Sequence, residues 1–133
     1  MGEPIQLTDL QVAIMQVLWE KGEASVAEIS EALRPERALA QTTVATLLTR
    51  LEKRGAVIHR NRARQYLYRA TISESEVRGS MVGELTERLF GGDVTALMSH
   101  LLTARDISAG DLARVKRLVE AKETEGEVGR DDS

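Results

Sequence analysis

The sequence predicts a mainly α-helical fold with one small β-hairpin, from two patterns in a chain of 133 residues. Apolar side chains recur at intervals of three and four along most of the chain, which is the period of an amphipathic helix. Only residues 57–60 and 65–69 are instead rich in β-branched or aromatic side chains, and they lie at hairpin distance from each other. Helices therefore make up most of the predicted fold, and the two strands form its hairpin.

Three helices are predicted ahead of the hairpin, at about residues 9–20, 26–33 and 41–54. The first two each begin with a capping-box pattern, in which a Ser or Thr is followed three positions later by Glu or Gln. These pairs are Thr8 with Gln11 and Ser25 with Glu28. Gly22 is placed to end the first helix, because glycine readily adopts the left-handed conformation found after a helix C-terminus.

The third helix has the clearest period, with apolar residues at Val44, Leu47, Leu48 and Leu51. Its opposite face carries small side chains and then cations: Thr42, Ala45, Thr46, Thr49, Arg50 and Lys53. Small side chains let a helix lie close to base edges in the major groove of DNA, and an arginine can bind guanine or a phosphate. Gln41, Thr42 and Thr43 lie at the helix N-terminus, where we expect them to bind a phosphate, with capping as the alternative for Gln41 and Thr43.

The hairpin and the end of the third helix are strongly basic. Residues 50–69 hold seven cationic side chains and one acid, a net charge of +6 within a chain of net charge −3. A concentrated basic surface is typical of phosphate binding. We expect Arg60, Arg62 and Arg64 to contact the DNA backbone, with Tyr66 as a further phosphate contact. The three arginines alternate, so they share one face of an extended strand unless the turn interrupts them.

A helix-turn-helix followed by a two-stranded hairpin is a winged helix, which makes double-stranded DNA the first partner to consider. Tyr68 is expected to pack the hairpin against the third helix. The alternative is a protein-interaction module whose basic hairpin docks an acidic partner. The residues expected to bind DNA are Gln41, Thr42, Thr43, Thr46, Thr49, Arg50, Lys53, Arg60, Arg62, Arg64 and Tyr66.

The second half of the chain is acidic, with a net charge of −5 in residues 71–133 against +2 in residues 1–70. Its apolar periods indicate three more helices, at about residues 74–90, around 94–102, and from Ser108 to about 122. These helices carry more apolar surface than one small subunit can easily bury, so we expect a homodimer, with packing against the first domain as the alternative. The residues expected in the dimer are Val77, Met81, Leu85, Leu89, Val94, Leu97, Met98, Leu101, Leu112, Val115 and Leu118.

Three regions follow from these patterns. Residues 1–70 are predicted to form a winged-helix DNA-binding domain, and residues 71–123 a three-helix dimerisation domain. Residues 124–133 have almost no apolar side chains, so we expect them to form a disordered tail.

Composition and motifs give no sign of catalysis or of a bound metal or cofactor. The chain has no cysteine, which excludes disulfides and thiolate metal sites. His59 and His100 lack metal-ligand spacing, and neither a nucleophile motif nor a phosphate-binding glycine loop is present. No segment offers the ~20 apolar residues of a membrane span, and no signal peptide is apparent. We therefore expect a cytoplasmic protein that is not an enzyme and has no membrane partner.

Several short motifs stand in order along the chain: Leu18-Trp19, Thr43-Val44, Lys53-Arg54-Gly55, Tyr66-Leu67-Tyr68 and Leu89-Phe90-Gly91-Gly92. With these motifs the chain, over about residues 7–122, resembles the penicillinase and methicillin-resistance repressors, the BlaI/MecI/CopY family. The resemblance implies a homodimeric transcriptional repressor that binds a palindromic operator through its winged helix and whose C-terminal helices intertwine. It also implies a role in the response to β-lactams or cell-wall stress.

The resemblance also bears on how repression ends. Copper-responsive members use a C-terminal cysteine cluster, which this chain lacks, so copper release by that route is excluded. Other members are cleaved by a sensor protease at an Asn-Phe pair in the fifth helix, and His100-Leu101 stands at the aligned position here. A regulatory protease is therefore one partner to consider. The alternative is a MarR-like regulator that responds to a small ligand, against which the scarcity of aromatic residues argues.

Overall fold

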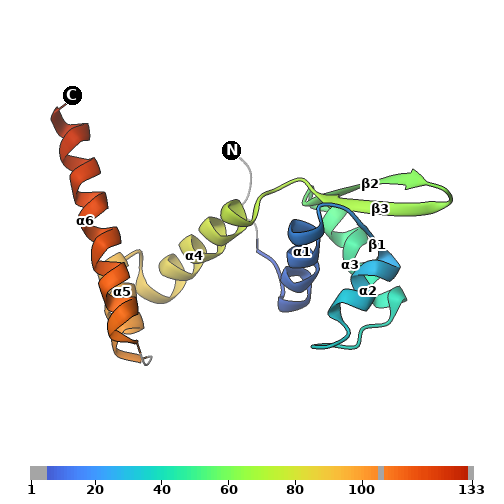
Figure 1. The fold of residues 1–133 in the computed structure, drawn as a ribbon, viewed down its shortest axis with the longest axis horizontal. Coiled ribbons are helices and arrows are strands. Elements are labelled where there is room, and N and C mark those ends of the chain that lie inside the picture. The colour runs from blue at the N-terminus through green and yellow to red at the C-terminus, as the bar shows by residue number, and fades with distance from the viewer. Residues whose placement is uncertain (1–5, 105–106, 132–133) are drawn as a thin grey trace. The chain divides into compact units, whose positions relative to one another are not determined.

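The structure is a computed structural model that describes residues 6–104 and 107–131 (Figure 1). The chain divides into two compact units, Met1–Leu89 and Phe90–Ser133, and each is described by itself. The first unit contains helices and a small antiparallel sheet, and the described residues of the second form two helices after the end of α4.

The first unit has the predicted helices and hairpin in the predicted order. Its elements are α1 (Asp9–Lys21), β1 (Ala24–Ser25), α2 (Val26–Leu33), α3 (Gln41–Lys53), β2 (Val57–Arg62), β3 (Gln65–Ala70) and α4 (Glu74–Phe90), which ends at the first residue of the second unit. The capping boxes of Thr8 with Gln11 and Ser25 with Glu28 are present, and the same spacing in the sequence predicts the third, in which Ser73 and Glu76 open α4. Gly22 follows α1 with a φ of +84°, as its capping role requires.

β1 is an element that the sequence pattern did not predict. It has only two residues, and Ser25 is both part of the strand and the N-cap of α2. Ala24 pairs with Tyr68 and Ser25 with Leu67, so the sheet has the antiparallel order β1-β3-β2. β1 therefore attaches the segment between α1 and α2 to the hairpin.

β2 and β3 form the predicted hairpin, which extends beyond the helices of this unit (Figure 1). The two strands are joined by a two-residue turn, Ala63–Arg64, with φ angles of +52° and +68°. Arg64 thus lies in the turn itself. The alternation of Arg60 and Arg62 along β2 ends before Arg64, as expected if the turn intervened.

The register of the hairpin divides its side chains between two faces. His59 lies opposite Tyr68, and Asn61 lies opposite Tyr66, so these four residues share one face. Tyr68 is buried, which makes this the inner face, toward the core. The β2 arginines, Arg60 and Arg62, alternate with His59 and Asn61 and therefore lie on the outer face.

The core of the first unit combines α1, α2, α3 and the sheet. Its completely or almost completely buried apolar residues include Ile14, Met15, Leu18, Ile29, Val44, Leu48, Leu51 and Val57. Three of them belong to α3 and occupy one stripe of that helix. Burial of this stripe turns the opposite face of α3 to solvent.

Two residues expected in the dimer belong to the chain's own core. Val77 on α4 is buried, with 3% of its surface exposed, and Met81 packs partly buried against the same cluster. In the same region Trp19 Nε1 of α1 donates a hydrogen bond of 2.9 Å to the carbonyl oxygen of Ile72, just before α4. The first unit consequently extends to Leu89, beyond the boundary at residue 70 that the sequence predicts.

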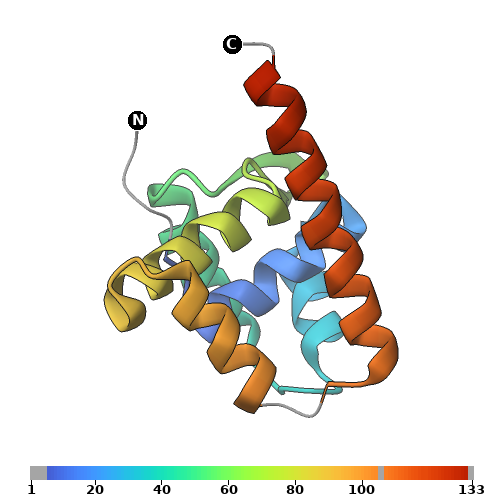
Figure 2. The same ribbon diagram turned by 90° about the vertical axis from the view of Figure 1, so that its left-hand side faces the viewer.

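The second unit consists of α5 (Val94–Ala104) and α6 (Ala109–Asp131), which diverge rather than pack along each other over their described residues (Figure 2). Ser108 caps α6 as predicted, its Oγ accepting a hydrogen bond of 3.0 Å from the Asp111 N–H. The predicted disordered tail differs from the structure, because α6 continues to Asp131 and residues 132–133 lie outside the described residues. Residues 120–125 are rich in Ala, Glu and Lys, which are good helix formers.

Candidate nucleic-acid interface

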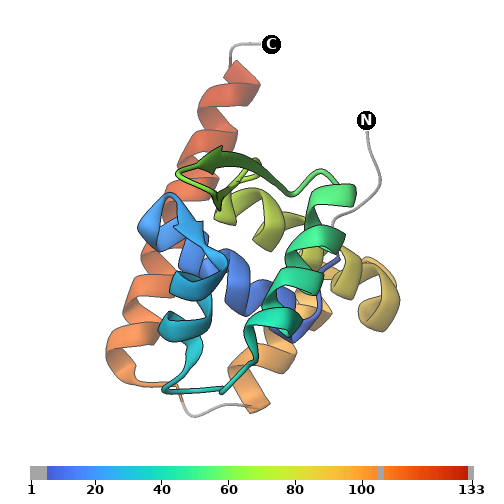
Figure 3. The same cartoon turned by 90° about the vertical axis from the view of Figure 1, so that its right-hand side faces the viewer.

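The outer face of α3 is exposed along its whole length, and Figure 3 shows α3 and the hairpin on the side of this unit that faces the viewer. The predicted DNA-binding residues of α3 are all exposed: Gln41, Thr42, Thr43, Thr46, Thr49, Arg50 and Lys53. Arg50 and Lys53 form neither a hydrogen bond nor an ion pair with any residue in the described part of the chain. Their charges are thus available to an outside partner.

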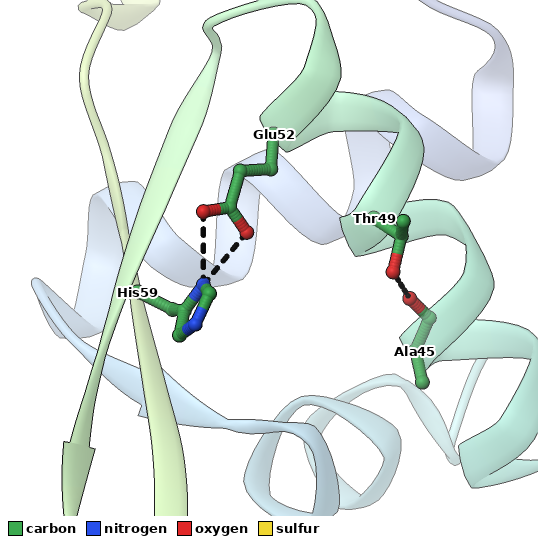
Figure 4. A network of polar contacts seen from close by, with 4 residues as sticks. All are labelled: Ala45, Thr49, Glu52 and His59. Atoms are coloured by element: carbon green, nitrogen blue, oxygen red, sulfur yellow. Dashed lines mark hydrogen bonds and ion pairs between the residues drawn. The ribbon is translucent and has the colours of Figure 1, made fainter.

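Two of the hydroxyl groups on this face, those of Thr46 and Thr49, donate hydrogen bonds to the helix backbone. Thr46 Oγ1 donates a hydrogen bond of 3.0 Å to the carbonyl oxygen of Thr42. Thr49 Oγ1 donates an equal bond of 3.0 Å to the carbonyl oxygen of Ala45 (Figure 4). The protons of both hydroxyls are therefore occupied within the helix, while their oxygens retain acceptor capacity.

The N-terminus of α3 has no side-chain cap. Its N-cap residue is Ala40, so neither Gln41 nor Thr43, the alternative caps, fills this position. The first helical bond runs from the Val44 N–H to the Ala40 carbonyl oxygen, at 3.1 Å. The N–H groups that precede it point out of the helix end, where the helix dipole favours an anion.

A hollow of about 520 Å³ lies beside this helix end. It is lined by the start of α2, the first residue of α3 and the tip of the hairpin: Ser25, Val26, Ala27, Gln41, Asn61, Arg64, Gln65 and Tyr66. Arg64 and Tyr66, expected at the DNA backbone, are thus brought next to the uncapped end of α3.

Arg60, which the sequence predicts at the DNA backbone, is paired with an acid of the same unit. Its Nε and Nη2 donate hydrogen bonds of 2.6 and 2.7 Å to the two carboxylate oxygens of Glu23, just before β1. The hydrogen bond from Arg60, with the nearby charges of Arg60, Arg62 and Arg69, lowers the pKa of Glu23, and the same bond raises the pKa of Arg60. Arg62 and Arg64 form no hydrogen bond or ion pair with another described residue.

Glu52, the acid of the basic segment, is held by the hairpin. His59 Nδ1 lies 2.7 and 2.9 Å from the two carboxylate oxygens of Glu52, and Figure 4 shows the two side chains pointing toward each other. The His59 ring lies between Tyr66 and Tyr68, with ring centroids at 4.4 and 5.3 Å. This contact joins the last turn of α3 to the inner face of the hairpin.

The two tyrosines differ as the sequence suggested. Tyr68 is buried, and burial, with smaller contributions from the charge of Glu52 and from Tyr66, raises the pKa of its phenol. Tyr66 is 51% exposed. Tyr68 is thus a packing residue, as predicted, and Tyr66 is accessible.

Sequence reasoning did not predict two contacts between an acid and a basic side chain, Glu23 with Arg60 and Glu52 with His59. Glu23 lies 37 positions before Arg60 and is brought to it through the short strand β1. Glu52 and His59 are seven positions apart but belong to a helix and a strand, so no single periodic pattern links them. Arg54 is likewise engaged, since its Nη1 donates to the carbonyl oxygen of Gln6.

Apolar side chains of the C-terminal helices are exposed in the single chain. Leu89 at the end of α4 and Leu118 on α6 are 71% and 70% exposed. The other exposed members of the predicted dimer set are Leu85, Val94, Met98, Leu101 and Leu112, whereas Leu97 and Val115 are half-buried.

The described residues contain no group of three or more His, Cys, Asp or Glu side chains that could hold a metal ion. Over the same residues, no helix is long and apolar enough to cross a membrane.

Comparison with known proteins identifies the kind of chain this is. The family model described as penicillinase repressor matches residues 7–121. The transcriptional regulator BlaI of Mycobacterium tuberculosis is 33% identical over 116 residues, which cover 86% of this chain and 84% of that protein. The penicillinase repressor of Bacillus licheniformis is 23% identical over 115 residues, covering 86% of this chain and 90% of that protein.

A solved structure matches the N-terminal part of the chain. The solution structure of the DNA-binding domain of the repressor BlaI superposes with a TM-score of 0.50 and 29% sequence identity, covering 57% of this chain and 93% of that domain. The winged-helix fold predicted from the sequence is confirmed by this match.

Proposed function

Because this chain belongs to the penicillinase repressor family and is a DNA-binding transcriptional repressor, we propose that it acts as a homodimer on a palindromic operator. In this proposal α3 enters the major groove, and the tip of the hairpin contacts the sugar-phosphate backbone. The observation that carries it is the exposed face of α3, which presents threonines together with Arg50 and Lys53, two cations that no described residue pairs.

The face of α3 suits a base-reading surface. Thr42, Thr46 and Thr49 are short, so the helix backbone can approach the base edges closely. Arg50 is long, planar and unpaired, and a guanidinium can bind O6 and N7 of guanine through two parallel hydrogen bonds. Lys53, one turn further on, is suited to a phosphate at the groove edge.

The hairpin tip and the start of α3 suit the backbone. Arg62 and Arg64 are exposed cations that form no hydrogen bond or ion pair with another described residue, and Arg64 shares a hollow with Gln41 and Tyr66. Phosphate oxygens accept hydrogen bonds from arginine, from a phenol and from the free N–H groups of a helix N-terminus. In this proposal Arg60 is not a phosphate contact, because its guanidinium already donates two hydrogen bonds to Glu23.

The C-terminal helices are proposed to supply the dimer. α5 and α6 do not cover each other over their described residues, and Leu101, Met98 and Leu118 are left exposed. A second copy of the chain would bury these side chains and place two winged helices on one duplex. Two linked half-sites strengthen binding through effective concentration.

Dissociation of the repressor from its operator is proposed to follow cleavage of α5 by a regulatory protease in the cytoplasm. His100 and Leu101 are exposed near the middle of α5. A cut there would separate α6 from the rest of the chain and remove its share of the dimer. The names of the relatives point to control of β-lactam resistance.

The direct test is a mobility-shift assay of the full chain on the promoter region of its own gene, at physiological salt. We expect a complex that survives an excess of unrelated duplex, because base readout adds to the sequence-independent phosphate term. A complex that unrelated duplex removes completely would contradict sequence-specific repression.

The contribution of the hairpin is tested by the salt dependence of operator binding. Replacing both Arg62 and Arg64 by Ala should reduce the slope of log affinity against log salt by about 1.8, since each phosphate contact contributes about 0.9. Arg60→Ala, in the same strand, is the matched control and should leave the slope unchanged because Glu23 holds this side chain. An equal loss of slope in Arg60→Ala would show that Arg60 leaves Glu23 to bind DNA.

A further inference from the structure

We propose that Thr46 and Thr49 read A·T base pairs, each as a hydrogen-bond acceptor and a methyl group. This inference rests on the proposed placement of α3 in the major groove and names the base chemistry that this face selects.

Both threonines lie at the centre of the outer face of α3. Successive residues of a helix are rotated by about 100°, which places Thr46 and Thr49 on the side opposite the buried stripe of Val44, Leu48 and Leu51. Both side chains are exposed. Among the positions of this helix, they are well placed to meet the floor of a groove, while Arg50 lies to one side of them.

The hydrogen bonds within the helix decide what these side chains can offer. Each hydroxyl proton is donated to the carbonyl oxygen four residues earlier, at 3.0 Å for both Thr46 and Thr49. A hydroxyl that has placed its proton in this way can still accept a hydrogen bond, but it can donate to a base only after its intrahelical bond breaks. Each threonine therefore presents an acceptor oxygen and a methyl group.

The major-groove edges of the base pairs respond differently to this pair of groups. An A·T pair presents the N6 amine of adenine, which donates, and the C5 methyl of thymine, which packs against an apolar group. A G·C pair presents the acceptors N7 and O6 of guanine, which an acceptor oxygen cannot satisfy, and the N4 amine of cytosine, which donates but has no methyl group beside it. A·T is thus the pair that uses both the oxygen and the methyl group of a back-bonded threonine.

Arg50 has the opposite chemistry. Its guanidinium has only donors and forms no hydrogen bond or ion pair within residues 6–104 and 107–131, which suits the two guanine acceptors. The face of α3 therefore divides into an acceptor-and-methyl region at Thr46 and Thr49 and a donor region at Arg50. The predicted half-site has A·T pairs beside a G·C pair.

The experiment pairs two substitutions at each threonine with modified operators. Thr49→Ser removes the methyl group and keeps the hydroxyl, whereas Thr49→Val removes the oxygen and keeps the side-chain shape. The same two changes are made at Thr46. Affinities for the promoter duplex are measured with each thymine in turn replaced by deoxyuridine, which lacks the C5 methyl.

For the wild type, we expect a loss of about fourfold at the thymines that face Thr46 and Thr49, the effect of burying about one methyl group. Thr49→Ser should show the same loss on the unmodified duplex and no further loss on deoxyuridine at its own position, because the contact is already gone. Thr49→Val should lose about 2- to 12-fold, the effect of one hydrogen bond. Its sensitivity to deoxyuridine should remain.

Thr124 on α6 provides the control. Its Oγ1 donates to the carbonyl oxygen of Glu120 at 3.1 Å, the same arrangement at a position remote in sequence from the winged helix. Thr124→Ser and Thr124→Val should leave every affinity unchanged, and thermal unfolding of each variant checks that the fold is intact.

Two outcomes overturn the inference in different ways. If the wild type binds its promoter but no thymine depends on residue 46 or 49, or if guanine is required opposite them, the threonines do not read A·T pairs and the proposed function stands. If the wild type shows no sequence-specific binding, the proposed function fails and the base readout fails with it.

Discussion

Arg60 and Arg62 lie two residues apart on the same face of β2, yet only Arg60 has a carboxylate within hydrogen-bond distance. The difference arises from Glu23, which precedes β1 and reaches across to the base of the hairpin rather than to its tip. A count of basic side chains in the sequence treats the two arginines alike. Only the pairing of β1 with β3 shows which of them is held by the protein.

The Glu23–Arg60 pair should make stability depend on pH in the acid range. The pKa of Glu23 is lowered in the folded state, so its contribution is present above the ordinary carboxyl range and is lost as pH falls through the lowered value. Glu23→Gln should therefore be less stable than the wild type near neutral pH and should approach it at about pH 3. Urea unfolding at the two pH values measures this difference.

The size of that difference should be small and should shrink in high salt, because both side chains are largely exposed. Glu31→Gln is a suitable comparison, since Glu31 of α2 forms an exposed ion pair with Arg34, the residue that follows the helix. A stability difference for Glu23→Gln that stays constant down to acid pH would show that the carboxylate charge is not its cause.

At the scale of helices and strands, local sequence rules were sufficient for most elements. Thr8, Ser25 and Ser73 each open a helix with the capping box that the sequence displays, and the period of α3 identifies its buried stripe. β1 could not be predicted, because two residues carry no period and their strand geometry depends on pairing with Tyr68 and Leu67. The start of α4 at Glu74 is confirmed, because the capping box of Ser73 and Glu76 is a local signal.

Ser25 connects two of these elements and should be sensitive to substitution. Its Oγ accepts a hydrogen bond of 3.1 Å from the Glu28 N–H at the start of α2, and its own backbone belongs to β1. Ser25→Ala should reduce the free energy of unfolding by about 1 kcal/mol, within the range for a lost N-cap. Chemical denaturation measures the change.

Ser75→Ala on α4 is the matched control, because Ser75 is exposed and lies inside the helix rather than at its cap. It should change stability little. Equal destabilisation by the two substitutions would show that loss of a serine hydroxyl, rather than loss of the cap, is responsible.

At the scale of the whole chain, the apolar residues that recur along the C-terminal half have two different environments, and the sequence does not distinguish them. Val77 and Met81 continue the same stripe as Leu85 and Leu89, but the first two pack on the core of the first unit and the last two are exposed. An apolar period of this kind shows that a helix face is apolar and does not show which surface covers it.

The exposed set should be required for dimer formation. Replacing Leu101 and Leu118 together by Glu should give a chain mass of 14.7 kDa in light scattering, where the wild type is expected to give twice that value. Operator binding should weaken strongly in the same variant, since each half-site then binds alone. Mass and affinity are measured on one preparation.

Ser99→Glu with Thr124→Glu adds the same charge to exposed polar positions of α5 and α6 and should leave both mass and affinity unchanged. A wild-type chain that is a monomer at all concentrations tested would contradict the proposed homodimer without affecting the winged helix.

The turn at the tip of the hairpin has a residue, Arg64, that lowers the stability of the fold but is proposed to strengthen DNA binding. Ala63 and Arg64 both adopt positive φ, a region that disfavours any residue with a Cβ by roughly 1–2 kcal/mol and in which Asn-Gly is the preferred pair. A glycine at position 64 would relax the backbone but remove the cation that lines the hollow beside α3. Laboratory selection of this chain for thermal resistance alone would thus favour glycine at position 64. The most heat-resistant variants would be those that bind DNA more weakly, because they lack this arginine.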